Sequence, residues 1–168
     1  MQKAKEKFLE IEELFQRMNH EICVVVESYH IWRTLTFSRS IPEVGEAQAN
    51  KNAKLMAIYK DFFIPTEQSH LQTFIIGLMK FFDKDPRALS VSALIKQIDE
   101  NKNLFTSDVL RVIYPDLNAI GAIQDDYMPI DSNTVAHIEQ LRKKHEKLIE
   151  SLKEVRKKQF AHTDMIPI

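Results

Sequence analysis

The chain has 168 residues, of which 44% are hydrophobic and 28% are charged, and its formal net charge is −1. These values are ordinary for one globular domain with a real core, and they argue against a disordered chain or a protein coated in basic residues. Only three glycines occur, which leaves little material for a many-stranded β architecture or a phosphate-cradling loop, so we expect an all-α fold.

An apolar stripe predicts the first helix, from about Lys3 to about Phe37. Its members follow each other at alternating spacings of three and four residues, the period of one helix face: Phe8, Ile11, Phe15, Met18, Ile22, Val25, Tyr29 and Trp32. The only cysteine, Cys23, lies in an apolar run of this stretch, and it has no partner for a disulfide or a multi-cysteine metal site. We therefore predict that Cys23 is a buried thiol.

A connection and a second helical stretch follow. Pro42 and Gly45 indicate that residues 38–50 connect two helices. The second stretch is expected from about Lys51 to Phe82, and Pro65 within it should kink or split it because proline has no backbone donor.

A turn at Asp83–Pro86 precedes a short helix that Ser90 can cap and that ends at Asn101–Asn103. The buried side of this short helix is expected to carry Val91, Leu94, Ile95 and Ile98. The next stretch, Asp108–Ile123, is predicted to be helical in part and interrupted by Pro115, and Asp125–Asp131 is predicted to be a polar loop.

A long last helix is expected to start at a cap on Asp131 or Ser132 and to run to about Phe160. Its apolar residues repeat at helical spacing: Val135, Ile138, Leu141, Leu148, Leu152 and Val155. The sequence shows no repeat and no linker, so we predict a single helical domain over residues 1–168 with long first, second and last helices.

Charge is segregated along the chain, although the net value is close to zero. Residues Arg142–Lys158 contain eight Lys or Arg and three Glu, a net charge of +5, whereas Asp99–Asp131 has a net charge of −5. The last helix is therefore the positive end of the protein. No apolar run is long enough to cross a bilayer and the N-terminus has no signal-peptide core, so we expect a cytoplasmic protein with no membrane partner.

Two Glu-x-x-His elements, Glu27–His30 and Glu67–His70, match the unit that carboxylate-bridged di-metal bundles use in duplicate. Glu27 lies two residues away from the buried position Tyr29, so it should point away from the bundle interior. The di-metal bundle is therefore kept only as a third interpretation. Solvated Glu–His pairs are favoured over it, and no metal or cofactor is predicted.

The segment Arg156–Asp164, at the end of the basic helix, carries the most informative chemistry. A guanidinium can hold a phosphate through two hydrogen bonds, and a histidine can transfer a proton near neutral pH. Here Arg156 precedes His162 by six residues. On an ideal helix this spacing leaves the two side chains roughly 120° apart and about 9 Å apart along the axis, so one pair does not easily grip one phosphate.

This segment resembles the HEPN superfamily (higher eukaryotes and prokaryotes nucleotide-binding). Members often carry Arg-x-Lys-x-x-Ala-His followed by Asp in a late helix, and here the matching residues are Arg156, Lys158, Ala161, His162 and Asp164. The middle of the chain is similar to the AbiU branch of bacterial abortive-infection proteins, through Phe74–Asp83 (FIIGLMKFFD) and Ala88–Ile95 (ALSVSALI). The resemblance covers most of the chain from about Phe62 onward, except residues 105–129.

The resemblance implies a HEPN-type helical bundle that acts as a metal-independent endoribonuclease in a toxin–antitoxin or phage-defence system. Arg156 and His162 would be catalytic, and the 2′-hydroxyl of RNA would attack the neighbouring phosphate. The RNA backbone would be bound by Lys153, Lys157 and Lys158, with a further hydrogen bond from Gln159, and Asp164 would orient His162. The resemblance also implies a homodimer in which both copies of Arg156 and His162 converge, and a cognate antitoxin resembling a nucleotidyltransferase.

A non-enzymatic interpretation keeps the fold but gives the basic helix only a binding role, toward a nucleotide, RNA or an acidic partner. It rests on Lys157, because the family usually places Asn, Asp or His directly after the arginine. The chain also ends in Met165-Ile-Pro-Ile168, which is too apolar for a typical solvated tail and favours a chain that continues past Ile168.

Overall fold

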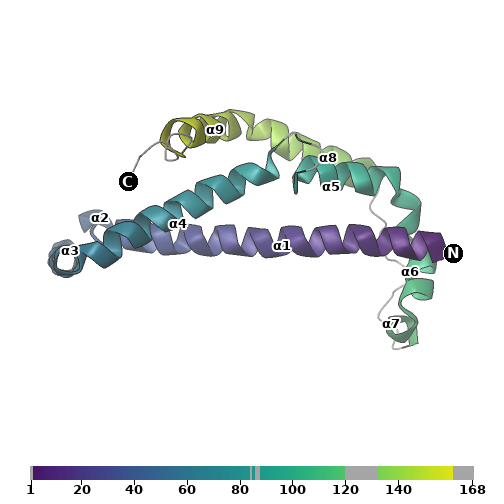
Figure 1. The fold of residues 1–168 in the computed structure, drawn as a ribbon, viewed down its shortest axis with the longest axis horizontal. Helices are drawn as coiled ribbons and strands as arrows, with labels where there is room; N and C mark the ends of the chain where they lie inside the picture. The colour runs from purple at the N-terminus through teal and green to yellow at the C-terminus, as the bar shows by residue number, and fades with distance from the viewer. Residues whose placement is uncertain (1, 84, 86–87, 120–131, 161–168) are drawn as a thin grey trace, which may run out of the picture. The chain divides into compact units, whose positions relative to one another are not determined.

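The computed structural model describes residues 2–83, 85, 88–119 and 132–160, and every regular element in these ranges is a helix (Figure 1). The all-α fold is thereby confirmed. None of the helices in these ranges combines the length and hydropathy that crossing a membrane requires. The chain divides into two compact units, Met1–Met18 with Phe81–Ser151, and Asn19–Lys80 with Leu152–Ile168. The single domain expected over residues 1–168 stays a prediction.

The first helix, α1 (Gln2–Phe37), is one long helix, as its apolar stripe predicted (Figure 1). Two members of the stripe are exposed, Phe15 at 58% and Ile22 at 43%, and the last two, Tyr29 and Trp32, are half-buried. Phe15 and Ile22 lie at the edge of the buried face, roughly 60° and 40° around the helix from buried Met18. The prediction of a buried Cys23 is wrong: its side chain is exposed, roughly 140° around the helix from Met18.

The first unit contains a run of short helices after the first half of α1. They are α5 (Val91–Glu100), the 3₁₀ helix η1 (Lys102–Leu104), α6 (Ser107–Ile113) and α7 (Pro115–Ala119). Ser90 caps α5 as predicted, because its hydroxyl accepts a hydrogen bond of 3.2 Å from the Ala93 amide. Asn101 ends α5, and α6 ends at its cap Tyr114, directly before Pro115, the first residue of α7, so both predicted boundaries are confirmed.

An aromatic cluster holds this unit together. The core consists of Phe8, Ile11, Leu104, Phe105 and Ile113. The Phe8 ring lies 5.5 Å from the Phe105 ring and 6.0 Å from the Tyr114 ring, between centroids. The Tyr114 hydroxyl donates a 2.5 Å hydrogen bond to the Glu12 carboxylate, and burial together with this carboxylate raises the pKa of Tyr114 to about 12.

The predicted last helix is broken into α8 (Ser132–Lys144) and α9 (Glu146–Phe160). At the break the His145 amide is shared between the carbonyls of Leu141 and Arg142, both at 3.2 Å, which is a local tightening of the helix. Apolar periodicity continues across this point, so it could not predict the break. Asp131, one of the two predicted caps, and the predicted loop at residues 125–131 lie outside the described residues.

In the second unit, α4 (Lys60–Phe81) runs back along the second half of α1 (Figure 1). The Phe74 and Tyr29 rings lie 5.1 Å apart, and Lys80 Nζ lies 3.7 Å from a Glu21 carboxylate oxygen. Gly77 is needed between the two helices, because a Cβ there would meet Val25 Cγ2 at 2.4 Å. These contacts make an antiparallel helix pair.

The segment between α1 and α4 is more helical than predicted. It forms α2 (Ile41–Val44) and α3 (Glu46–Ile58), joined at Gly45, whose φ of 79° is the left-handed conformation that glycine tolerates. The second helical stretch is split as predicted, but at Tyr59 and not at Pro65, which lies inside α4. The Tyr59 carbonyl accepts hydrogen bonds from the amides of Phe62 and Phe63, so the first turn of α4 has formed before Pro65, which has no amide donor.

Candidate functional site

The end of α9 carries the helical half of the predicted Arg–His site. Arg156 lies near the C-terminal end of α9 and is exposed, as are Lys157 and Lys158. Lys153 is half-buried one turn earlier. Gln159 is part of the helix, but its side chain is not among those described, and His162 and Asp164 lie outside the described residues. The convergence of Arg156 with His162 therefore stays a prediction.

Helix geometry puts three of the cations on one face. Lys153, Arg156 and Lys157 are related by steps of three and four residues, so their side chains are neighbours on the surface of α9. Arg156 also follows Leu152 by four residues, and Leu152 is half-buried. Arg156 therefore lies on the same side of α9 as the half-buried Leu152 but is itself exposed. A cation at this position can contact a second molecule.

The second feature of this site is that Arg156 is exposed. None of the described residues holds it in a hydrogen bond or an ion pair. Arg142, at the end of α8, differs in this respect, because its Nη1 donates to Ser92 Oγ at 2.9 Å and lies 3.4 Å from Glu139. Arg142 therefore fastens α8 to α5, and it contributes less to a ligand-binding surface than the charge count over Arg142–Lys158 suggests.

The second Glu-x-x-His element is used structurally. Both Glu67 carboxylate oxygens accept from the Arg39 guanidinium, at 2.8 and 2.9 Å, and one also accepts from Thr36 Oγ1 at 2.6 Å. A metal ligand would need these lone pairs free. Glu27, from the first element, is exposed. Across residues 2–83, 85, 88–119 and 132–160, no three His, Cys, Asp or Glu side chains gather as a metal site requires.

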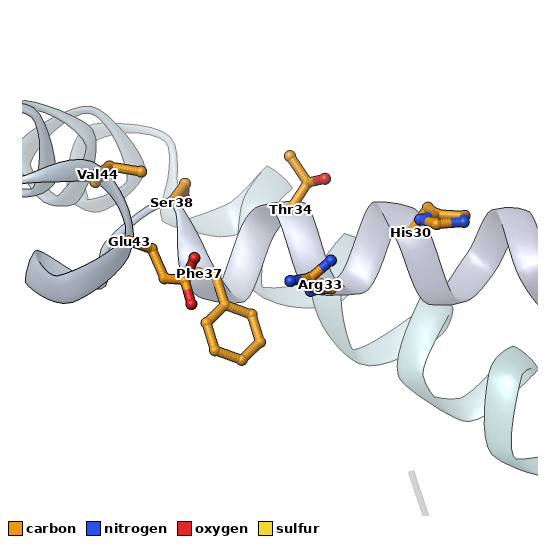
Figure 2. A pocket seen from close by; sticks show the side chains of 7 residues that line it. All are labelled: His30, Arg33, Thr34, Phe37, Ser38, Glu43 and Val44. Atoms are coloured by element: carbon orange, nitrogen blue, oxygen red, sulfur yellow. The ribbon is translucent and has the colours of Figure 1, made fainter.

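A hollow of about 270 Å³ lies where α1 ends and α2 begins. We call it the α1–α2 hollow, and it is lined by His30, Arg33, Thr34, Phe37, Ser38, Glu43 and Val44. Figure 2 shows Glu43 reaching from α2 toward the side of α1 that carries Arg33 and Phe37. From the sequence, His30 was considered only as part of a Glu-x-x-His element, and neither Arg33 nor Phe37 was predicted to line a site. A helix face with a histidine, an arginine and an aromatic at steps of three and four was the available signal.

Comparison with known proteins identifies the family of the chain. Residues 8–168 match the HEPN family AbiU2, a range that contains all of α2 to α9 and the sequence from Arg156 to Asp164. No curated protein and no solved structure matches the chain.

Proposed function

The chain belongs to the AbiU2 family of HEPN proteins, and on this premise we propose that it is a metal-independent endoribonuclease of abortive infection, acting as a toxin or phage-defence component. The observation that carries the proposal is the position of Arg156. Its guanidinium is exposed near the end of α9, none of the described residues holds it, and it precedes His162 by six residues in the family's arrangement.

The reaction needs one cation and one proton carrier. Arg156 holds the scissile phosphate through two N–H donors and offsets the charge that grows on its oxygens. His162 accepts the proton of the ribose 2′-hydroxyl as the 2′-oxygen bonds to phosphorus. The bond from phosphorus to the 5′-oxygen breaks, that oxygen takes up a proton, and the products are a 2′,3′-cyclic phosphate and a 5′-hydroxyl. Asp164 orients His162, and Gln159 adds a hydrogen bond to the substrate.

The lysines around Arg156 serve binding more than chemistry. Lys153 and Lys157 share its helix face and Lys158 follows directly, so an RNA backbone lying along α9 meets several cations in succession. Such contacts are independent of sequence and weaken as salt is added. This part of the site therefore contributes affinity for RNA and little base preference.

Two chains complete the site. A separation of six residues points Arg156 and His162 roughly 120° apart on a helix, so one chain alone does not enclose a phosphate easily. When two copies of α9 meet about a two-fold axis, the arginines and histidines of both chains face one cleft. A homodimer is thus part of the proposed mechanism, and a cognate antitoxin resembling a nucleotidyltransferase would act by blocking this cleft.

The second candidate is a HEPN module that binds a nucleotide, RNA or an acidic partner without cleavage. One observation favours it: Lys157 and Lys158 lie in the last turn of α9, where cations stabilise a helix through its dipole without any catalytic role. Lys157 also replaces the residue that HEPN proteins usually place after the arginine.

Incubation of RNA with the pure protein in EDTA separates the two candidates. We expect fragments that end in a 2′,3′-cyclic phosphate, since transesterification by Arg156 and His162 requires no metal. An Arg156→Ala protein purified in the same way controls for contaminating ribonuclease, which would cleave in both preparations. Intact RNA, or fragments with 3′-hydroxyl ends, would contradict the proposed reaction.

A further inference from the structure

The α1–α2 hollow lies entirely within the second unit and uses none of the residues proposed for cleavage. Its volume of about 270 Å³ is just below the usual lower bound of about 300 Å³ for ligand pockets, so it suits one small unit of a ligand. Its lining combines a guanidinium, an imidazole, a phenyl ring, hydroxyl groups and a carboxylate. This combination of groups restricts the chemistry of a ligand more than a patch of basic side chains would.

Arg33 and Phe37 line the hollow next to each other on α1. The Arg33 guanidinium carbon lies 5.8 Å from the centre of the Phe37 ring, and the two residues are one helical turn apart. The Phe37 side chain is 39% exposed, so part of the ring is open to a ligand. No described residue forms an ion pair with Arg33, whereas the Arg39 guanidinium is occupied by both oxygens of Glu67.

Apart from Val44, the remaining residues that line the hollow are polar, and they include both a basic and an acidic side chain. His30 precedes Arg33 by three residues and Thr34 by four, so an imidazole, a guanidinium and a hydroxyl share one part of the helix surface. Glu43 lines the hollow from α2, and Figure 2 shows its carboxylate on the same side of α1 as Phe37. A simple anion would be repelled by Glu43 and would leave the phenyl ring unused. A ligand that fits must carry an anionic group, a flat apolar face and a hydrogen-bond donor.

A nucleotide has these three parts, and we propose that the α1–α2 hollow binds one nucleotide of a single-stranded RNA. The base stacks on Phe37 beside Arg33, the phosphate is bound by Arg33 and His30, and an exocyclic amine of the base donates to Glu43. A single strand is required because the bases of a duplex are not free to stack on a side chain. The inference rests on the proposed function only in taking RNA as the ligand, and it adds an RNA contact outside α9.

Fluorescence anisotropy of labelled ten-nucleotide RNAs tests the proposal, in EDTA and with full-length Arg156→Ala protein so that no cleavage occurs. Phe37→Ala should weaken binding of oligo(A) and oligo(C) by about tenfold, within the usual range for loss of one stacking contact. Phe62→Ala is the matched control, because Phe62 is also an exposed phenylalanine of the second unit and should leave affinity unchanged. Glu43→Ala should remove a preference for oligo(A) and oligo(C) over oligo(U).

The two arginine variants give an independent readout. Arg33→Ala should weaken binding more than Arg17→Ala, which removes the same charge from an exposed position of α1 that does not line the hollow. Equal effects of Phe37→Ala and Phe62→Ala would overturn the proposal, as would equal affinity for duplex RNA. Free AMP binding as tightly as the oligonucleotides would also overturn it, since the occupant would then be a free nucleotide.

The outcomes for the hollow and for the enzyme are separable. A wild-type protein that cleaves no RNA but binds single strands in a manner dependent on Phe37 would support the hollow and contradict the ribonuclease. Cleavage that depends on Arg156, together with an RNA affinity unchanged by Phe37→Ala and Glu43→Ala, would support the ribonuclease and contradict the proposal for the hollow.

Discussion

Gly77 of α4 lies against Val25 of α1 so closely that a Cβ at Gly77 would come within 2.4 Å of Val25 Cγ2. Val25 is buried and its β-branched side chain has little rotamer freedom, so it cannot move aside easily. This contact lets the two helices of the second unit approach each other closely.

Gly77→Ala is expected to destabilise the protein. The higher helix propensity of alanine contributes about 1 kcal/mol of stability, but overpacking costs about 1–3 kcal/mol. We therefore expect the free energy of unfolding, measured by heat or urea, to fall by about 1 kcal/mol. In a Val25→Ala background the same change should be neutral or stabilising, because the clash is gone. Stabilisation by Gly77→Ala in the wild-type background would show that the helices are not in this contact.

The hydrogen bond from Tyr114 to Glu12 should make stability depend on pH in the alkaline range. The pKa of Tyr114 is raised to about 12 in the folded protein, above the ordinary value of 10.0. The stabilisation is therefore fully present below pH 10 and is lost as the pH rises toward 12. The free energy of unfolding of Tyr114→Phe should be about 1 kcal/mol lower than that of the wild type at pH 8. Above about pH 10 it should fall less steeply with pH than that of the wild type. Parallel curves for the two proteins would contradict this.

Glu67 should be a structural residue and not a metal ligand. Glu67→Gln weakens the pairing of this residue with Arg39. We expect the free energy of unfolding to fall by up to about 1 kcal/mol, since the Glu67 side chain is 20% exposed. Glu27→Gln, in the other Glu-x-x-His element, is the matched control and should have no effect. Elemental analysis should find no stoichiometric transition metal in any of the three proteins. About two metals per chain, lost in Glu67→Ala, would instead establish the di-metal bundle.

The structure also shows which parts of the fold local sequence signals can predict. The extent of α1, the Ser90 cap and the break at Pro115 were predicted because periodicity, capping and proline chemistry act within a few residues. Periodicity also marked Phe15 and Ile22 as buried, and that was wrong. It identifies the apolar side of a helix, but how wide a strip is covered depends on the elements that pack there.

The same distinction applies to the candidate sites. Arg156 was placed near the end of a helix by its surrounding pattern, and the structure has it there. The α1 side of the α1–α2 hollow had a signal in the helical spacing of its residues, but Glu43 joins the lining only because the chain turns from α1 into α2. The break at His145 was equally hidden, since the apolar spacing continues through it.

The composite site predicts complementation between inactive chains. Arg156→Ala and His162→Ala homodimers should each be almost inactive, whereas mixed dimers retain one functional arginine and one functional histidine in the shared cleft. Mixing the two proteins under conditions that exchange subunits should therefore restore part of the cleavage activity. Light scattering should give the mass of a dimer for each protein. A stable monomer, or a mixture no more active than its components, would remove the composite site.

The most direct test compares cleavage and binding of one RNA by the wild type and His162→Ala in EDTA. If His162 transfers a proton in the rate-determining step, its removal should slow cleavage by at least about a hundredfold while the affinity changes little, whereas Arg156→Ala should lower both. The contrary result is a wild-type protein that cleaves no RNA yet binds RNA tightly, with salt-sensitive affinity that survives His162→Ala. That outcome would contradict the ribonuclease and leave a HEPN binding module.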